Sequence, residues 1–367
     1  MTRVIITTLL AVIALLFLST VTAPVAVGAD APAFSVPPEP DRTAEHSSIA
    51  DAEWVPLPVV PEPITELQQA PSICDESHWI LSIRHCPQDC PRCACRFEFG
   101  VSRADWDGNW QPSSMEELQS WLTPGLPICV MVHGSFVTNE TVAEDSCRTF
   151  HWLREAAPHL PLQVIFVTWP SDGIFTIDPA VAASSLIPNF DVGILGRRAE
   201  LNGCRLARLV QSLPPESPVC LLGHSHGARM VTSACHFLGG GELHGIRVSE
   251  GPCHRVRAIL AAAAVDHDWI VPGQRYERAL DGAQCVLNLQ SRFDWALGIY
   301  PLRRPFSRRA LGQAGFTSGD LRRLGDRSPQ VANFDVSKQL GIGHIWPRYY
   351  ERPEIAASLV PWVYFTE

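Results

Sequence analysis

The sequence predicts an α/β protein with a mostly parallel central sheet, helices on both faces and a small cap insertion. Short, continuous apolar runs, such as residues 127–132 and 162–167, are typical of strands buried on both faces of a parallel sheet. Segments with helical periodicity, such as residues 195–213, separate these runs. Such alternation favours right-handed crossovers, and functional sites are then expected at the carboxyl ends of the strands.

The elements follow in order along the chain. A serine, Ser113 or Ser114, is expected to cap the first helix, because Glu116 and Glu117 would then lie in its first turn. A turn is expected at residues 105–110. We expect strands at residues 79–83, 96–101, 127–132, 162–167, 219–223, 258–265, 285–289 and 333–336, and helices at 114–122, 142–157, 195–213 and 353–363, with a further helix after residue 227.

Length and charge limit the possible functions. The chain has 367 residues, of which 46% are hydrophobic, which is enough for one large domain with appendages. The formal net charge is −9 and no run of lysine or arginine dominates, so nucleic acid is not an expected partner.

The N-terminal region predicts export. Arg3 is the only charged residue of residues 1–29, and a long apolar run ends at small residues, as in a cleaved signal peptide. The protein is then secreted, periplasmic or part of the cell envelope, and a membrane tether exists only if this segment stays uncleaved. Residues 30–71 carry nine of the 31 prolines and predict a linker, which leaves residues 72–367 for the folded domain.

Twelve cysteines in an exported chain favour disulfides. Five of the cysteines form a dense group, most of it within residues 85–95. We interpret this group as a disulfide-stapled loop between the first two strands. Zinc bound through thiolates is the alternative. The group comprises Cys74, Cys86, Cys90, Cys93 and Cys95. The other seven cysteines are scattered and are expected to act as small buried hydrophobic residues.

One segment carries the strongest chemical signal. Ser225 lies in Gly-x-Ser-x-Gly, directly after an apolar run and before a helical segment, as in a nucleophile elbow. Side chains at Gly223 or Gly227 would collide with the neighbouring strand or helix. The backbone N–H of His226 and the positive end of the new helix can then face a developing oxyanion.

A second signal follows the strand at residues 127–132. His133 and Gly134 lie at its carboxyl end, and the loop after them can offer a second amide to the oxyanion hole, from Ser135 or Phe136. The sequence leaves open which of the two donates. His133 itself is expected to order this loop rather than to carry a proton.

A serine nucleophile needs a base that takes its proton. The base in turn needs an anion that fixes its tautomer and stabilises its charged form. Asp294, at the end of a later strand, is the preferred acid, and Asp266 is the alternative. His344 is the only histidine after Asp294, so the order serine, acid, histidine leaves it as the base. The imidazole of His226 is expected to pack or to line a pocket wall.

These segments together resemble the α/β-hydrolase superfamily and, more narrowly, its uncharacterised DUF900-type branch. The similarity covers about residues 78–364 and implies the α/β-hydrolase fold and the triad roles of Ser225, Asp294 and His344. The cysteine loop and the linker lie outside the family pattern. The residues that carry the resemblance are His133-Gly134, residues 168–173 (TWPSDG), residues 223–227, Asp266 and Asp268, Ser291-x-x-Asp294-x-x-Leu297, and His344.

An insertion at about residues 301–330 is expected to cap the site. Its arginines would favour acidic or phosphate-bearing substrates, or they would form a solvated face with ion pairs. They are Arg303, Arg304, Arg308, Arg309, Arg322, Arg323 and Arg327.

The function expected from these observations is that of a serine hydrolase. It would cleave small-molecule or lipid carboxylic esters through an acyl-enzyme, without a cofactor or a catalytic metal. An acyltransferase would use the same triad. Two alternatives come from other functional classes. One is a non-catalytic exported binding protein with the hydrolase fold, and the other is a hydrolase fold that serves as the carrier of a zinc module.

Overall fold

The computed structural model describes residues 77–86, 98–172, 188–248, 251, 254–303 and 307–366. All of these residues belong to one unit of the chain, Pro56–Glu367. The predicted signal peptide, the linker and most of the cysteine loop lie outside the described residues. Among the helices that the structure describes, none combines the length and apolar character needed to cross a membrane.

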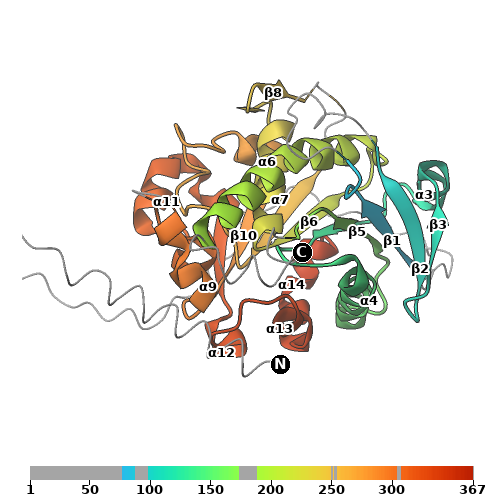
Figure 1. The fold of residues 1–367 in the computed structure, drawn as a ribbon. Helices are drawn as coiled ribbons and strands as arrows, with labels where there is room; N and C mark the ends of the chain where they lie inside the picture. Colours follow the sequence, from blue (N-terminus) through green and yellow to red (C-terminus); the bar gives the residue numbers. More distant parts are fainter. Residues whose placement is uncertain are drawn as a thin grey trace, which may run out of the picture. The chain divides into compact units, whose positions relative to one another are not determined.

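A nine-stranded sheet forms the centre of the unit (Figure 1). Its strand order is β11-β10-β9-β6-β4-β5-β1-β2-β3. All neighbours from β11 to β1 are parallel, whereas β2 pairs antiparallel with β1 and with β3, so the predicted mostly parallel sheet is confirmed. The strands are β1 (Ser77–Ser82), β2 (Gly100–Asp105), β3 (Trp110–Ser113), β4 (Ile128–Val132), β5 (Gln163–Thr168), β6 (Val219–His224), β9 (Val256–Ala261), β10 (Cys285–Gln290) and β11 (Val331–Asp335).

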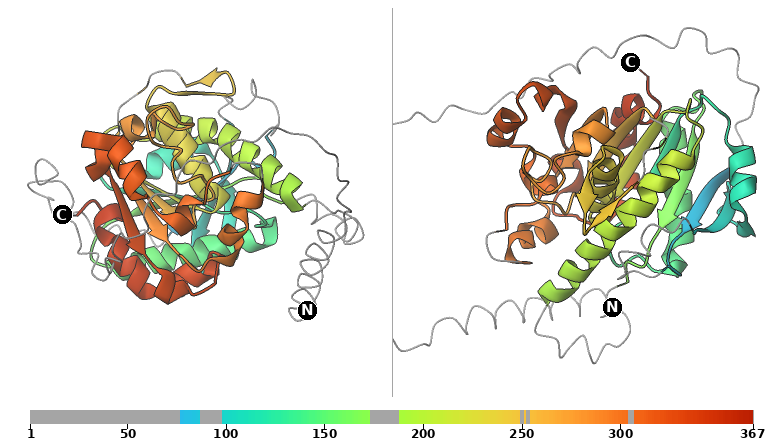
Figure 2. Two further views of the ribbon diagram at one scale, coloured as in Figure 1. Left: turned by 90° about the vertical axis from the view of Figure 1, so that its left-hand side faces the viewer. Right: turned by 90° about the horizontal axis from the view of Figure 1, so that it is seen from above.

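Helices cover both faces of the sheet, because the central strands are apolar on both sides. In β4, Val130 belongs to one buried cluster, while its neighbours Cys129 and Met131 belong to the other. The first cluster lies under α3 (Met115–Trp121), α6 (Pro188–Ser212) and α7 (His226–Leu238), and the second under α4 (Asn139–Ala156), α13 (Pro347–Tyr350) and α14 (Pro353–Val363). Figure 2 shows α6 lying along the sheet.

Smaller elements connect this framework. A two-stranded ribbon of β7 (Glu242–Leu243) and β8 (Ile246–Arg247) follows α7. Short helices fill the region after β9. They are α8 (Ala279–Gly282), α9 (Trp295–Gly298), η2 (Tyr300–Arg303), α10 (Leu311–Ala314), α11 (Ser318–Leu324), η3 (Gly325–Gln330) and α12 (Ser337–Leu340).

The second strand differs from the prediction. The structure places β2 at Gly100–Asp105 rather than at 96–101, because its register with β1 pairs Ser82 with Gly100. The turn expected at residues 105–110 is present, and Asp105 accepts hydrogen bonds from the Asn109 backbone at 2.9 Å and side chain at 3.1 Å. The turn continues into β3, a strand that the sequence analysis did not predict.

The insertion expected as a cap packs in part against the strand ends. Leu311 donates its N–H to the Val265 carbonyl at 2.8 Å, and Gly312 donates to Ala263 at 3.1 Å. Two insertion arginines, Arg308 and Arg323, lie within 4 Å of Asp268 as ion pairs. For these arginines the structure agrees with a solvated face that carries ion pairs.

Candidate active site

The strand β6 turns sharply into helix α7 at Ser225. This serine has φ 54° and ψ −117°, a conformation that is strained for a residue with a side chain. A Cβ added at Gly223 would lie 2.5 Å from the Gly227 carbonyl, and one at Gly227 would lie 2.3 Å from the Val132 carbonyl. Both glycines are therefore required by close backbone approach, as the sequence analysis predicted.

The structure brings Ser225, His344 and Asp294 together. The Ser225 Oγ lies 3.0 Å from His344 Nε2, and His344 Nδ1 lies 2.7 Å from Asp294 Oδ2. Asp294 is fully buried at the N-cap of α9, where its other carboxylate oxygen accepts the Leu297 N–H at 3.0 Å. Because a carboxylate accepts hydrogen bonds, this arrangement holds the proton on Nδ1 and turns the lone pair of Nε2 toward Ser225.

The alternative acid lies elsewhere. Asp266 forms an isolated β-bridge with Ala310, and its Oδ2 accepts the Arg308 N–H at 3.5 Å. Asp268 faces arginines of the insertion. Of these three aspartates, Asp294 is the one that contacts the imidazole of His344.

The loop after β4 approaches the serine closely. A Cβ at Gly134 would lie 2.6 Å from His224 Nδ1 and 3.0 Å from Ser225 Cβ, so this position also requires glycine. The Ser135 hydroxyl lies 2.7 Å from Nδ1 of His226, which ties the loop to the first residue of α7.

The two candidate amides of this loop differ. Phe136 donates its N–H to the Ser171 carbonyl at 2.9 Å, so the expectation that its amide is available to an oxyanion is not met. The Ser135 amide donates to none of the residues that the structure describes. The amide of His226 is the first of α7 and lies at the N-terminus of this helix, directly after Ser225.

His133 orders the loop from beneath. It is fully buried, and burial lowers its pKa to about 3, so the ring is neutral at physiological pH. Its Nε2 accepts the Trp169 N–H at 3.2 Å, which leaves the proton on Nδ1 for donation to the Gly134 carbonyl at 2.8 Å. The Trp169 indole in turn donates to the His133 carbonyl at 2.9 Å. These contacts agree with the loop-ordering role that was expected.

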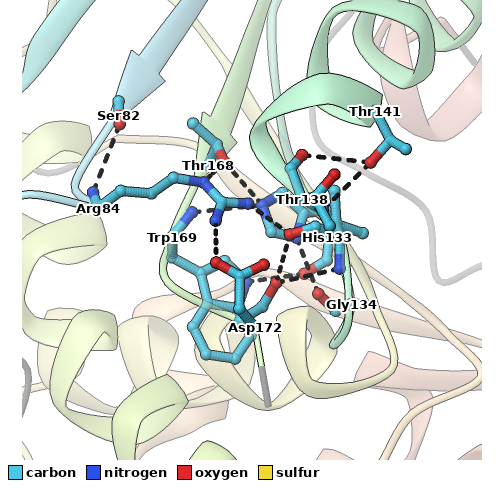
Figure 3. Close-up of polar contacts among 11 residues, drawn as sticks. Ser82, Arg84, His133, Gly134, Thr138, Thr141, Thr168, Trp169 and Asp172 are labelled. Carbon is cyan, nitrogen blue, oxygen red and sulfur yellow. Dashed lines mark hydrogen bonds and ion pairs between the residues drawn. The ribbon is translucent and has the colours of Figure 1, made fainter. Parts of the chain in front are cut away.

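Arg84, just after β1, joins three segments around this histidine (Figure 3). Its guanidinium donates to Thr168 Oγ1 at 2.8 Å, to Asp172 Oδ2 at 2.8 Å and to the Val137 carbonyl at 2.5 Å. Thr168 Oγ1 lies 2.9 Å from His133 Nε2. The sequence analysis missed Arg84, because its partners lie 53 to 88 residues further along the chain.

A second buried histidine supports the loop that carries His344. Burial lowers the pKa of His224 to about 3, and its neutral Nε2–H donates to the His344 carbonyl at 2.6 Å. Trp346 packs against the same ring at a tilt, with ring centroids 5.5 Å apart, and donates its indole N–H to Thr149 of α4 at 2.8 Å. The sequence analysis assigned no role to His224, although it stands inside the Gly-x-Ser-x-Gly motif and is therefore bound to lie near the serine.

Exposed apolar side chains occur in the chain segments that carry the predicted site residues. Eight large hydrophobic residues are exposed among those that the structure describes, and six of them flank the predicted catalytic residues in sequence. We call these six the apolar rim: Phe136, Phe293, Trp295, Ile299, Ile342 and Ile345. Ile342, two residues before His344, is 71% exposed, and Phe293, next to the fully buried Asp294 in sequence, is 60% exposed.

The sheet order, the helices on both faces and the strand–serine–helix turn define an α/β-hydrolase fold. No protein-family model matches the chain, and no curated protein matches it. The narrower DUF900-type resemblance therefore stays a prediction.

Solved structures similar to this chain include three hydrolases. Esterase B from Lactobacillus Rhamnosis is 12% identical, with 78% of this chain and 84% of that chain covered and a TM-score of 0.37. Acyl-protein thioesterase 2 from Zea mays is 15% identical, with 65% and 93% covered and a TM-score of 0.36. The poly(3-hydroxybutyrate) depolymerase LpqC from Bordetella parapertussis is 19% identical, with 65% and 81% covered and a TM-score of 0.32.

The two buried neutral histidines predict a loss of stability in mild acid. Unfolding returns His133 and His224 to an ordinary pKa of about 6.5, so the unfolded state binds more protons below that pH. The free energy of unfolding should fall by up to about 1.4 kcal/mol per pH unit for each histidine as the pH drops from about 6 to about 4. Urea unfolding at several pH values in this range gives the free energy of unfolding as a function of pH. This free energy should depend less steeply on pH for His224→Gln than for the parent. An unchanged pH dependence would contradict a neutral, buried His224.

Proposed function

We propose that the protein is a serine hydrolase that cleaves carboxylic esters through an acyl-enzyme. The observation that carries this proposal is the continuous hydrogen-bonded chain from Ser225 through His344 to Asp294. It combines a nucleophile, a base with its lone pair toward that nucleophile, and an anion that fixes the tautomer of the base. The general rule that sites form at the carboxyl ends of parallel strands also supports the proposal, because Ser225 directly follows β6 and Asp294 follows β10.

In the first half-reaction, Ser225 Oγ attacks the ester carbonyl carbon and His344 Nε2 takes the hydroxyl proton. Asp294 stabilises the imidazolium that forms. The tetrahedral intermediate then expels the alcohol, which leaves with the proton from His344, and the acyl group stays on Ser225. In the second half-reaction, water attacks the acyl-enzyme with the same base, and the acid product leaves.

The oxyanion of each intermediate needs two fixed donors, and we assign these to the amides of Ser135 and His226. The close approach of Gly134 to Ser225 supports this choice, as does the hydrogen bond between the Ser135 hydroxyl and His226. Because this hydrogen bond holds the two residues together, little reorganisation of their amides is needed when the negative charge develops.

Apolar esters suit the site best, and we include lipid esters among the substrates. The apolar rim lies in the same chain segments as the proposed oxyanion donor Ser135, the proposed acid and the proposed base, and its side chains are exposed to solvent. An apolar acyl chain that covers these side chains removes their surface from water, at about 25 cal/mol for each Å². A polar acyl group would gain no such hydrophobic free energy on binding.

Two other functions remain distinct from this proposal. An acyltransferase would use the same acyl-enzyme with an alcohol in place of water as the acceptor. A non-catalytic binding protein would not need Ser225 in its strained backbone conformation, because strain at one residue persists only where the surrounding structure enforces it.

Replacement of the nucleophile gives the first test. Ser225→Ala should lower kcat toward short-chain p-nitrophenyl esters by about 10⁴-fold or more, because no other group can form the acyl-enzyme. A fluorophosphonate probe should label the parent and leave this variant unlabelled, with circular dichroism showing that both are folded. Full activity in Ser225→Ala would rule out the serine mechanism.

The acid is tested by a matched pair of substitutions. Asp294→Asn should reduce kcat by about 10⁴-fold, because the amide would impose the wrong imidazole tautomer on His344. Asp266→Asn is the control, since Asp266 is also buried at a strand end but contacts the insertion instead. Steady-state kinetics should separate the two variants clearly, and a larger loss in Asp266→Asn would assign the acid to the earlier strand.

The apolar rim is tested by chain-length preference. Phe293→Ser and Ile342→Ser should each lower the ratio of kcat/KM for the octanoate over the butyrate p-nitrophenyl ester by about tenfold, a change worth about 1.4 kcal/mol. Trp110→Ser, on β3 and also exposed, should leave the ratio unchanged. An unchanged ratio in the rim variants would refute the lipid-ester preference while leaving the serine mechanism standing.

A further inference from the structure

Three potential metal ligands meet where the β1–β2 connection begins and ends. His85 and Cys86 follow β1, and Glu98 precedes β2. One imidazole nitrogen, the thiol sulfur and one carboxylate oxygen from these residues all lie within 4.8 Å of one another. Among the residues that the structure describes, this is the single group of three or more such side chains close enough to share an ion.

The measured geometry fits a tetrahedral ion. His85 Nε2 lies 3.7 Å from Cys86 Sγ. In a tetrahedral zinc site, with bonds of about 2.0–2.1 Å to nitrogen and about 2.3 Å to sulfur, these two atoms are separated by about 3.6 Å. The two side chains can therefore bind one ion with little movement. The Cys86 thiol also donates to the Glu98 carbonyl at 3.4 Å, which holds the two ends of the connection together.

The chemistry of the ligands selects the metal. Imidazole, thiolate and carboxylate all bind zinc, whereas a thiolate disfavours the hard cations magnesium and calcium. His85 and Glu98 are exposed, so an ion can enter from solvent, and Cys86 is buried behind them. Three protein ligands leave a fourth tetrahedral position for water.

We propose that His85, Cys86 and Glu98 form a zinc site that closes the connection between β1 and β2. Zinc would replace the proton of the Cys86 thiol, which is released to solvent on binding. The site is separate from the serine mechanism and does not depend on it.

The disulfide loop predicted from the sequence is the main alternative. No disulfide joins any two of the seven cysteines that the structure describes, including Cys86. Its sequence neighbours Cys90, Cys93 and Cys95 lie outside the described residues, so a bridge to one of them must be tested directly.

The full chain, purified and treated with a chelator, should take up about one equivalent of zinc, measured by elemental analysis after gel filtration. Cobalt as a substitute should give the visible bands of a tetrahedral site and a thiolate charge-transfer band in the near ultraviolet. Each of His85→Ala, Cys86→Ser and Glu98→Gln should weaken zinc binding by about tenfold or more. Zinc should also raise the Tm of the parent.

Cys147 and His151 provide a matched control. Their Sγ and Nε2 atoms lie 3.9 Å apart, a similar contact, and no carboxylate among the described residues completes a group of three with them. Cys147→Ser and His151→Ala should therefore bind zinc as the parent does.

Two outcomes would overturn the proposal. Zinc binding that is lost in Cys86→Ser but unchanged in His85→Ala and Glu98→Gln would indicate a site made of cysteines alone. No bound zinc, together with a mass increase of about two units on reduction that Cys86→Ser abolishes, would establish a disulfide at Cys86 instead.

Discussion

The active-site region depends on one steric constraint, the close packing of backbone around Ser225. Side chains are excluded at Gly134, Gly223 and Gly227, so the loop after β4, the strand β6 and the helix α7 meet at backbone contact distance. The strained backbone of Ser225 is held from both sides, because it donates to the Ala261 carbonyl at 2.9 Å and its own carbonyl accepts the Ala264 N–H at 3.3 Å. This packing fixes the proposed nucleophile relative to the proposed oxyanion donors before any substrate arrives.

Buried polar groups then hold the loops that packing alone would leave mobile. His133 and His224 are both neutral because they are buried, and each uses its remaining N–H to hold a backbone carbonyl, of Gly134 and His344 respectively. A protonated imidazole at either place would carry an uncompensated buried charge. One histidine therefore orders the proposed oxyanion loop and the other orders the loop of the proposed base.

Much of this site could be predicted from sequence, because the relevant signals are local. The elbow at Ser225 is a pattern of five residues, and the order of residues along the chain left His344 as the histidine that the structure places beside Asp294. The choice between the Ser135 and Phe136 amides could not be made, since it depends on the Ser171 carbonyl, which belongs to another loop.

The sheet shows the same division between local and distant causes. The sequence analysis placed the apolar parallel strands to within a few residues. Each of these strands is buried on both faces, so its sequence is a continuous apolar run that can be recognised without knowing which strands pair with it. The position of β2 was wrong, since a strand with few buried residues takes its register from its partners, β1 and β3. Arg84 was missed for a similar reason, because nothing near it in sequence indicates that it joins Thr168, Asp172 and Val137.

Arg84 also connects the antiparallel edge of the sheet to the proposed chemistry. It precedes His85 and Cys86 directly, so an ion bound there would restrain the backbone from which its guanidinium reaches the loop after β4. The effect on that loop should be limited, because His133 and the Phe136 amide hold it through contacts of their own. The Arg84 side chain thus reaches from the end of β1 to the proposed oxyanion loop, and it takes no part in the hydrogen bonds that join Ser225, His344 and Asp294.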